Sequence, residues 1–182
     1  MYFCQMILNY KQMRKIFILR AILQFMVFFL VMGGVALLIM IPLILFNSGW
    51  DIPVTISGNY VEEFIVETKI IMVIGSIAYL LYVYAIFLLK KTIDLFIKKL
   101  LFDDKVIRNF NTIGKVFIVV ALLTSVPSFF YHAYTNQKFK MDLTAYDSDS
   151  MLFNVAIGLF FITLSEVFKI AKIQKQENDL TI

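Results

Sequence analysis

The residue types that most often carry out chemistry are scarce and scattered in this chain. It has one histidine, His132, and one cysteine, Cys4, and they lie at distant points of the sequence. Metal-assisted hydrolysis and nucleophilic catalysis need several His, Cys, Asp or Glu side chains that converge on one point. The sequence brings no such set together. We therefore expect a protein that is not an enzyme and that holds no metal and no cofactor.

Two groups of acidic residues have alternative interpretations. Glu62, Glu63 and Glu67 fall on a helix face and could ligate a cation, but metals need more convergent ligands, so a solvated loop end is favoured. Asp147 and Asp149 alternate as in calcium loops, but the remaining ligands of that series are missing. We interpret these aspartates as part of a cap for the helix that follows.

Glu166 is the best candidate for a polar residue inside the membrane. It closes an apolar run that begins near Met151, and a carboxylate so close to a membrane span is costly unless it is paired or reaches water. The favoured interpretation is a local pair with Lys169 at the membrane boundary, three residues further on. A functional acid is the alternative.

The composition requires a lipid environment. Hydrophobic residues make up 60% of the chain, and the mean hydropathy is +0.82, whereas soluble domains contain about 45–50% apolar residues. Since a span needs about 20 residues, the 182 residues leave little room for a soluble domain. We predict an all-α polytopic membrane protein, a four-transmembrane-helix bundle. It forms one membrane domain, residues 1–182, with spans at residues 21–46, 70–89, 112–131 and 151–170.

Positive charges are sorted between the segments that separate these spans. Fourteen of the 17 Lys and Arg residues precede the apolar run 21–46, lie between the runs 70–89 and 116–131, or follow the run 151–165. Only Lys69, Lys138 and Lys140 lie in the other two segments. Because positive charge resists translocation, both termini, the loop at residues 90–111 and the tail at residues 171–182 are predicted to be cytoplasmic.

The central loop has the most regular pattern outside the spans. Apolar residues such as Ile93 and Phe96 recur at helical spacing, with Lys90 and Lys98 mostly on the other face. This pattern predicts a cytoplasmic amphipathic helix between spans 2 and 3, lying on the inner membrane surface. A sharp turn follows, after which Asp103 is predicted to cap a helix that continues into the third span.

Small and phenolic residues in the first two spans suggest helix packing. Gly33 and Gly34 are interpreted as a packing notch, with a hinge as the alternative. Tyr79 and Tyr82 share a face of the second span and are expected to join neighbouring helices, with a polar ligand pocket as the alternative. Ala121 and Ser125 form a small-xxx-small pair in the third span.

Two motifs that lie mainly outside the spans resemble those of a known family. They are Leu101 and Phe102 followed by Lys105, Ile107, Ile113 and Gly114, and the terminal residues Glu177, Asn178, Asp179, Leu180, Thr181 and Ile182 after Phe168, Ala171 and Lys172. With this layout, residues 14–182 resemble the DUF2975 family of bacterial four-span membrane proteins. The resemblance implies a bacterial cytoplasmic (inner) membrane and a genomic neighbour that encodes a small helix-turn-helix transcription regulator. It carries no activity and no catalytic residue.

These observations favour a membrane anchor or sensor that interacts with such a regulator through its cytoplasmic face, or that self-associates as a homo-oligomer. The candidate partner-binding residues are Phe102 and an extended tail formed by Glu177, Asn178, Asp179, Leu180, Thr181 and Ile182. The net charge of +4 does not indicate direct nucleic-acid binding, because the basic residues flank spans and face the lipid headgroups of the bilayer. The alternative is a small transporter or channel component, with a path lined by Tyr79, Tyr82, Ser125, Asn154 and Glu166.

Overall fold

Four long helices make up nearly all of the structure, a computed structural model that describes residues 2–46, 55–56, 59–60, 66–135 and 148–180, with side chains for residues 14–43, 69–127 and 151–180. The helices are α1 (Tyr2–Phe46), α2 (Val66–Ile97), α3 (Asp104–Thr135) and α4 (Ser148–Leu180). Between α1 and α2 in the chain, β1 (Thr55–Ile56) pairs antiparallel with β2 (Asn59–Tyr60), and Thr55 lies opposite Tyr60.

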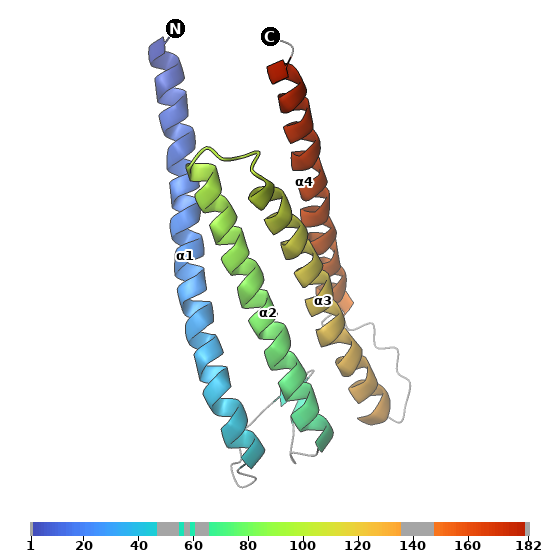
Figure 1. Cartoon of the computed structure of the whole chain (residues 1–182). Helices are drawn as coiled ribbons and strands as arrows, with labels where there is room; N and C mark the ends of the chain where they lie inside the picture. The colour runs from blue at the N-terminus through green and yellow to red at the C-terminus, as the bar shows by residue number, and fades with distance from the viewer. Residues whose placement is uncertain (1, 47–54, 57–58, 61–65, 136–147, 181–182) are drawn as a thin grey trace.

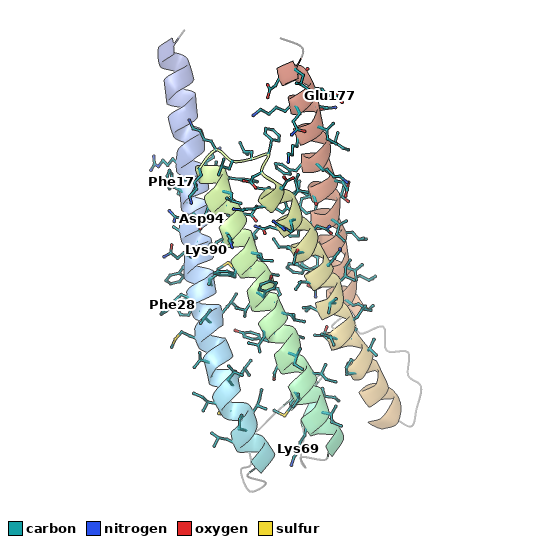
Figure 2. All side chains as sticks on the ribbon, in the orientation of Figure 1. Phe17, Phe28, Lys69, Lys90, Asp94 and Glu177 are labelled. Carbon is teal, nitrogen blue, oxygen red and sulfur yellow. The ribbon has the colours of Figure 1, made fainter. Side chains whose placement is uncertain are left out.

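Every helix contains a segment that is long and apolar enough to cross a membrane. These segments are Arg14–Leu43, Lys69–Ile97, Asp104–Pro127 and Met151–Leu180. Each predicted span lies within one helix, so the prediction of an all-α chain with four such helices is confirmed. Large apolar side chains cover the outside, and Figure 2 shows Phe17 and Phe28 projecting from α1 away from α2. Such a surface would aggregate in water, so the helices indicate a multi-pass membrane protein.

The helices are arranged as an open row in chain order. The backbone of α2 approaches that of α1, α3 approaches α2, and α4 approaches α3, as Figure 1 shows. In the part of the chain that the structure describes, no Cα of α1 lies within 8 Å of a Cα of α3 or α4. The predicted bundle is therefore not closed, because α1 and α4 form the two ends of the row.

A tight connection at residues 98–103 joins α2 to α3, and we call this end of the molecule the connection end. Leu100 N donates to Leu95 O and Lys99 N to Phe96 O, both at 3.0 Å, while Lys99 has φ of 59°. This is the Schellman ending of a helix, with Lys99 at the left-handed position that glycine usually occupies. Asp103 then caps α3, as predicted, because its Oδ1 accepts a hydrogen bond from Lys105 N at 2.8 Å.

The separate amphipathic helix expected on the membrane surface is not found. Residues 90–97 are the last turns of α2 itself. Their apolar side is covered by protein, since Ile93 packs with Leu23 of α1 and Phe96 packs against Phe110 and Phe168. The prediction was wrong because helical periodicity identifies an apolar face but not the surface that covers it.

The contact between α1 and α2 includes a close approach at Gly33 of the first span. Tyr79 Oη donates a hydrogen bond to Leu30 O at 2.8 Å across the two helices. A Cβ placed on Gly33 would lie 2.5 Å from that hydroxyl oxygen, so only glycine leaves room for it. This contact supports the packing interpretation of Gly33 and the role of Tyr79 in joining helices. Tyr82 contacts Phe117 of α3 edge to face, at 5.7 Å between ring centroids.

The contact between α3 and α4 depends on a pair of glycines. A Cβ on Gly114 would lie 2.5 Å from Gly158 O and 2.6 Å from Ile162 Cγ1. The two backbones therefore touch at this point, as small residues allow in membrane helices. Beside this crossing lie Phe110, Phe117 and Phe161, and Phe161 stacks on both of the others at about 6 Å.

We predict that Gly114→Ala destabilises the protein by about 1–3 kcal/mol, because the added methyl group meets backbone atoms that cannot move aside. Gly75→Ala is the matched control, since a Cβ on Gly75 meets nothing within 4 Å. This control should leave stability unchanged or raise it slightly through helix propensity. Reversible unfolding in mixed detergent micelles measures both variants. Equal stability of the two would contradict the proposed backbone contact.

Candidate functional site

Polar contacts between helices gather at the connection end. Four of them join neighbouring helices of the row, and together we call them the polar belt. They are Arg20 with Asp94, Asn109 with Thr92, Ser165 with Ile107 O, and Lys172 with Asp104. The belt links α1 to α2, α2 to α3, and α3 to α4.

The first contact of the belt is an ion pair between α1 and α2. Arg20 Nε lies 2.7 Å from Asp94 Oδ1, and the two side chains are 44% and 31% exposed. Asp94 Oδ1 itself is buried and accepts no hydrogen bond of good geometry, so the guanidinium stabilises it mainly by charge. Figure 2 labels Asp94 and Lys90 near this end of α2. Partial exposure and screening limit the strength of such a pair.

The two middle contacts of the belt place hydroxyl groups inside the helix interfaces. Thr92 is fully buried, and its Oγ1 donates to Leu88 O at 2.9 Å and accepts from Asn109 Nδ2 at 3.1 Å. Ser165 is also buried, and its Oγ donates to Ile107 O at 2.8 Å. A buried hydroxyl without a partner is costly, so these bonds fix the register of the helices.

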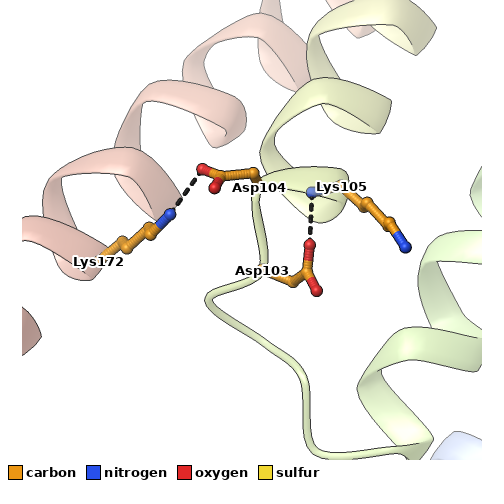
Figure 3. A network of polar contacts seen from close by, with 4 residues as sticks. All are labelled: Asp103, Asp104, Lys105 and Lys172. Atoms are coloured by element: carbon orange, nitrogen blue, oxygen red, sulfur yellow. Dashed lines mark hydrogen bonds and ion pairs between the residues drawn. The ribbon is translucent and has the colours of Figure 1, made fainter.

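The last contact of the belt lies at the start of α3, where two adjacent aspartates have different roles (Figure 3). Asp103 caps the helix through Lys105 N, whereas Asp104 Oδ1 lies 2.6 Å from Lys172 Nζ of α4. Lys172 is largely covered, with 24% of its side chain exposed, while 77% of the Asp104 side chain is exposed. The pair attaches the N-terminus of α3 to the C-terminal part of α4.

Phe102 of the first motif lies beside the part of α4 that leads into the second motif, just beyond the belt. Lys175 Nζ of α4 lies 5.4 Å from the ring centroid of Phe102 in the connection, at the distance of a cation–π contact. The tail is not extended as predicted, because α4 continues as a helix through Glu177, Asn178 and Asp179 to Leu180. Thr181 and Ile182 lie outside the described residues. Leu180 is 87% exposed at the helix end.

Glu166 has the local role favoured from the sequence. Its Oε2 lies 3.7 Å from Lys169 Nζ on the same helix, and both side chains are 58% exposed. The structure shows no contact of Glu166 with the two tyrosines of the alternative path. Tyr79 donates a hydrogen bond to Leu30 O of α1, and Tyr82 contacts Phe117 of α3. In the described part of the chain, these polar residues are not joined into one path. The side chains of His132 and Cys4 lie outside the described residues.

Sequence reasoning missed most of the polar belt. Asp94 is the one acid among Lys90, Lys91, Lys98 and Lys99, which is a signal for a structural ion pair. Thr92, Asn109 and Ser165 carry no such signal, because serine and threonine also occur in spans where they bond only to their own helix. Ser76 does so, donating to Met72 O.

We predict that Arg20 and Asp94 are energetically coupled. In a double-mutant cycle with Arg20→Gln and Asp94→Asn, the coupling energy should be about 1 kcal/mol, the upper range for a partly exposed pair. The matched control is the cycle of Glu166→Gln with Lys169→Gln, a pair on one exposed helix that should couple by about 0.3 kcal/mol or less. Unfolding free energies in mixed micelles give both values. Equal coupling in the two cycles would refute a belt that holds α1 to α2.

Comparison with known proteins agrees with the resemblance of the two motifs. No curated protein and no solved structure matches the chain. A family model described as "Protein of unknown function (DUF2975)" matches residues 21–182. The match covers three of the four membrane-crossing segments in full and the first one from residue 21 onward. The chain, with its row of four apolar helices and its polar belt, therefore belongs to the DUF2975 family.

Proposed function

We propose that this protein is a bacterial membrane anchor or sensor that captures a small helix-turn-helix transcription regulator at its connection end and so takes part in signalling. The observation that carries the proposal is the contact of Lys175 with Phe102, which places the first family-like motif beside the part of α4 that lies between Lys172 and Glu177 of the second. Beyond this contact, Asp179 and Leu180 are exposed at the end of α4. An apolar side chain beside an acid on a helix end suits a groove in a protein partner.

The charge distribution supports a cytoplasmic location of this surface. Both α1 and α4 extend past the connection between α2 and α3, so both termini project from the same end of the row (Figure 1). The positively charged segments of the chain belong to this end, and positive charge is retained in the cytoplasm. A regulator that binds DNA in the cytoplasm could reach such a surface. The membrane in this proposal is the bacterial inner membrane.

Removal of residues 177–182 should strongly reduce capture of the regulator. The full chain, tagged at its N-terminus, is purified from its native membranes and its partners are identified by mass spectrometry. The expected result is a helix-turn-helix regulator that is recovered with the full chain and reduced at least about tenfold in the truncated variant, since the end of α4 provides the docking contacts. The same partners in equal amount with both proteins would rule out the tail as the docking element.

A control variant separates docking from general damage to α4. Glu166→Gln combined with Val167→Ala changes an exposed acid and an exposed apolar residue on the same helix, further from the end of α4. This variant should capture the regulator as the full chain does. A transporter or channel component is the alternative function, but no contact among the described residues favours it over the anchor.

A further inference from the structure

Lys115 lies in an unusual position on α3. It is six residues further along the helix than Asn109 of the polar belt, which corresponds to about 9 Å. Its chain neighbour Gly114 is at the contact with Gly158, and beside Gly158 the side chains of Leu159 and Phe160 are 54% and 61% exposed. Lys115 is therefore an exposed cation at a level where the surface of the protein is apolar.

The face of α3 that carries Lys115 changes character along its length. Arg108 and Lys115 are seven residues apart, so they lie on one side of the helix, and both are exposed. The same side continues with Val119, Leu122 and Val126, which are 45%, 47% and 47% exposed. Two cations near the connection end are thus followed by an apolar strip toward the centre of the span. A phospholipid has the matching arrangement, with a charged headgroup followed by apolar acyl chains.

The charges of Arg108 and Lys115 are not balanced within the described structure. Two other cations of this end are each paired with a carboxylate, Arg20 with Asp94 and Lys172 with Asp104. Among the described residues, no carboxylate forms an ion pair with Arg108 or Lys115. Lys115 cannot turn inward, because the opposite side of α3 is filled by Ile113 and Phe117. A cation in this position is costly unless an anion or water reaches it.

The direction of α3 points both cations toward the connection end. Side chains of a helix lean toward its N-terminus, and α3 begins at the connection end. Lys115 therefore leans out of the apolar zone toward Arg108, and its long side chain can extend to the headgroup level. A phosphate between an ammonium and a guanidinium would receive charge-assisted hydrogen bonds from both.

We propose that this face of α3 binds an anionic glycerophospholipid, with the phosphate held by Arg108 and Lys115 and the acyl chains lying along Val119, Leu122 and Val126. This site is separate from the partner surface formed by Phe102 and the end of α4. The occupant is a lipid and not a free phosphate ester, because the apolar strip continues directly from the cations. The site does not depend on the identity of a protein partner.

Lipid binding to the purified full chain tests the proposal. Native mass spectrometry from detergent measures the affinity for phosphatidylglycerol, with phosphatidylcholine as the zwitterionic comparison. Phosphatidylglycerol should bind more tightly. Lys115→Gln and Arg108→Gln should each weaken its binding about fivefold, the effect expected for one basic residue at a lipid surface, while Lys115→Arg should retain it.

The matched control is Lys15→Gln, which removes one exposed positive charge from α1, a helix whose backbone does not approach α3. It should change phosphatidylglycerol binding less than twofold. Three results would overturn the proposal: an equal loss in Lys15→Gln and Lys115→Gln, equal affinity for the two lipids, or displacement of the lipid by an equal concentration of glycerol phosphate. Because both cations are exposed, the variants are expected to fold. Unchanged helix content and an unchanged elution volume in size-exclusion chromatography verify this.

Discussion

The whole structure depends on the requirement that backbone polar groups be bonded within the protein wherever lipid surrounds them. Each helix meets this requirement by itself. Contacts between apolar side chains of two helices replace contacts with equally apolar lipid, so the hydrophobic effect does not hold the helices together. Here two other interactions do so. Gly33 and Gly114 allow close approach of neighbouring helices, and the polar belt supplies hydrogen bonds and ion pairs at the connection end.

The open row follows from where these interactions occur. Each of them joins helices that follow one another in the chain, and none joins α1 to α4 within the described residues. At the connection end, Phe96 of α2 also stacks on Phe168 of α4, at 5.7 Å between centroids. The outer surfaces of α1 and α4 consequently carry large exposed apolar residues. A row with two free sides offers more surface to lipids than a closed bundle of the same helices.

The sequence predicted those features that depend on composition and local spacing. The apolar runs located the four helices, Asp103 identified the start of α3, and Gly33 indicated a packing notch. Features that depend on which surfaces meet could not be predicted. The apolar stripe of residues 90–97 has the same pattern whether lipid or protein covers it, and the closure of four helices into a bundle leaves no periodic signal.

The candidate site shows the same division. The local pair of Glu166 with Lys169 could be predicted because the residues are close in sequence. The contact of Ser165 with Ile107 O could not, because its partner is a backbone carbonyl 58 residues away on another helix. The helical form of residues 177–180 was missed since their polar composition resembles that of a free tail. The convergence of Phe102 and Lys175 likewise depends on the fold.

The most direct test of the central claim is the topology of the chain in a bacterial membrane. Cys4 is the only cysteine, so Cys4→Ser gives a protein into which single cysteines can be placed as Trp50→Cys, Lys98→Cys and Lys140→Cys. Each is treated in intact cells with a thiol reagent that does not cross the inner membrane. Four crossings with the connection end inside predict labelling at positions 50 and 140 and protection at position 98 until the cells are broken. Labelling of position 98 in intact cells, or protection of the other two, would contradict the account.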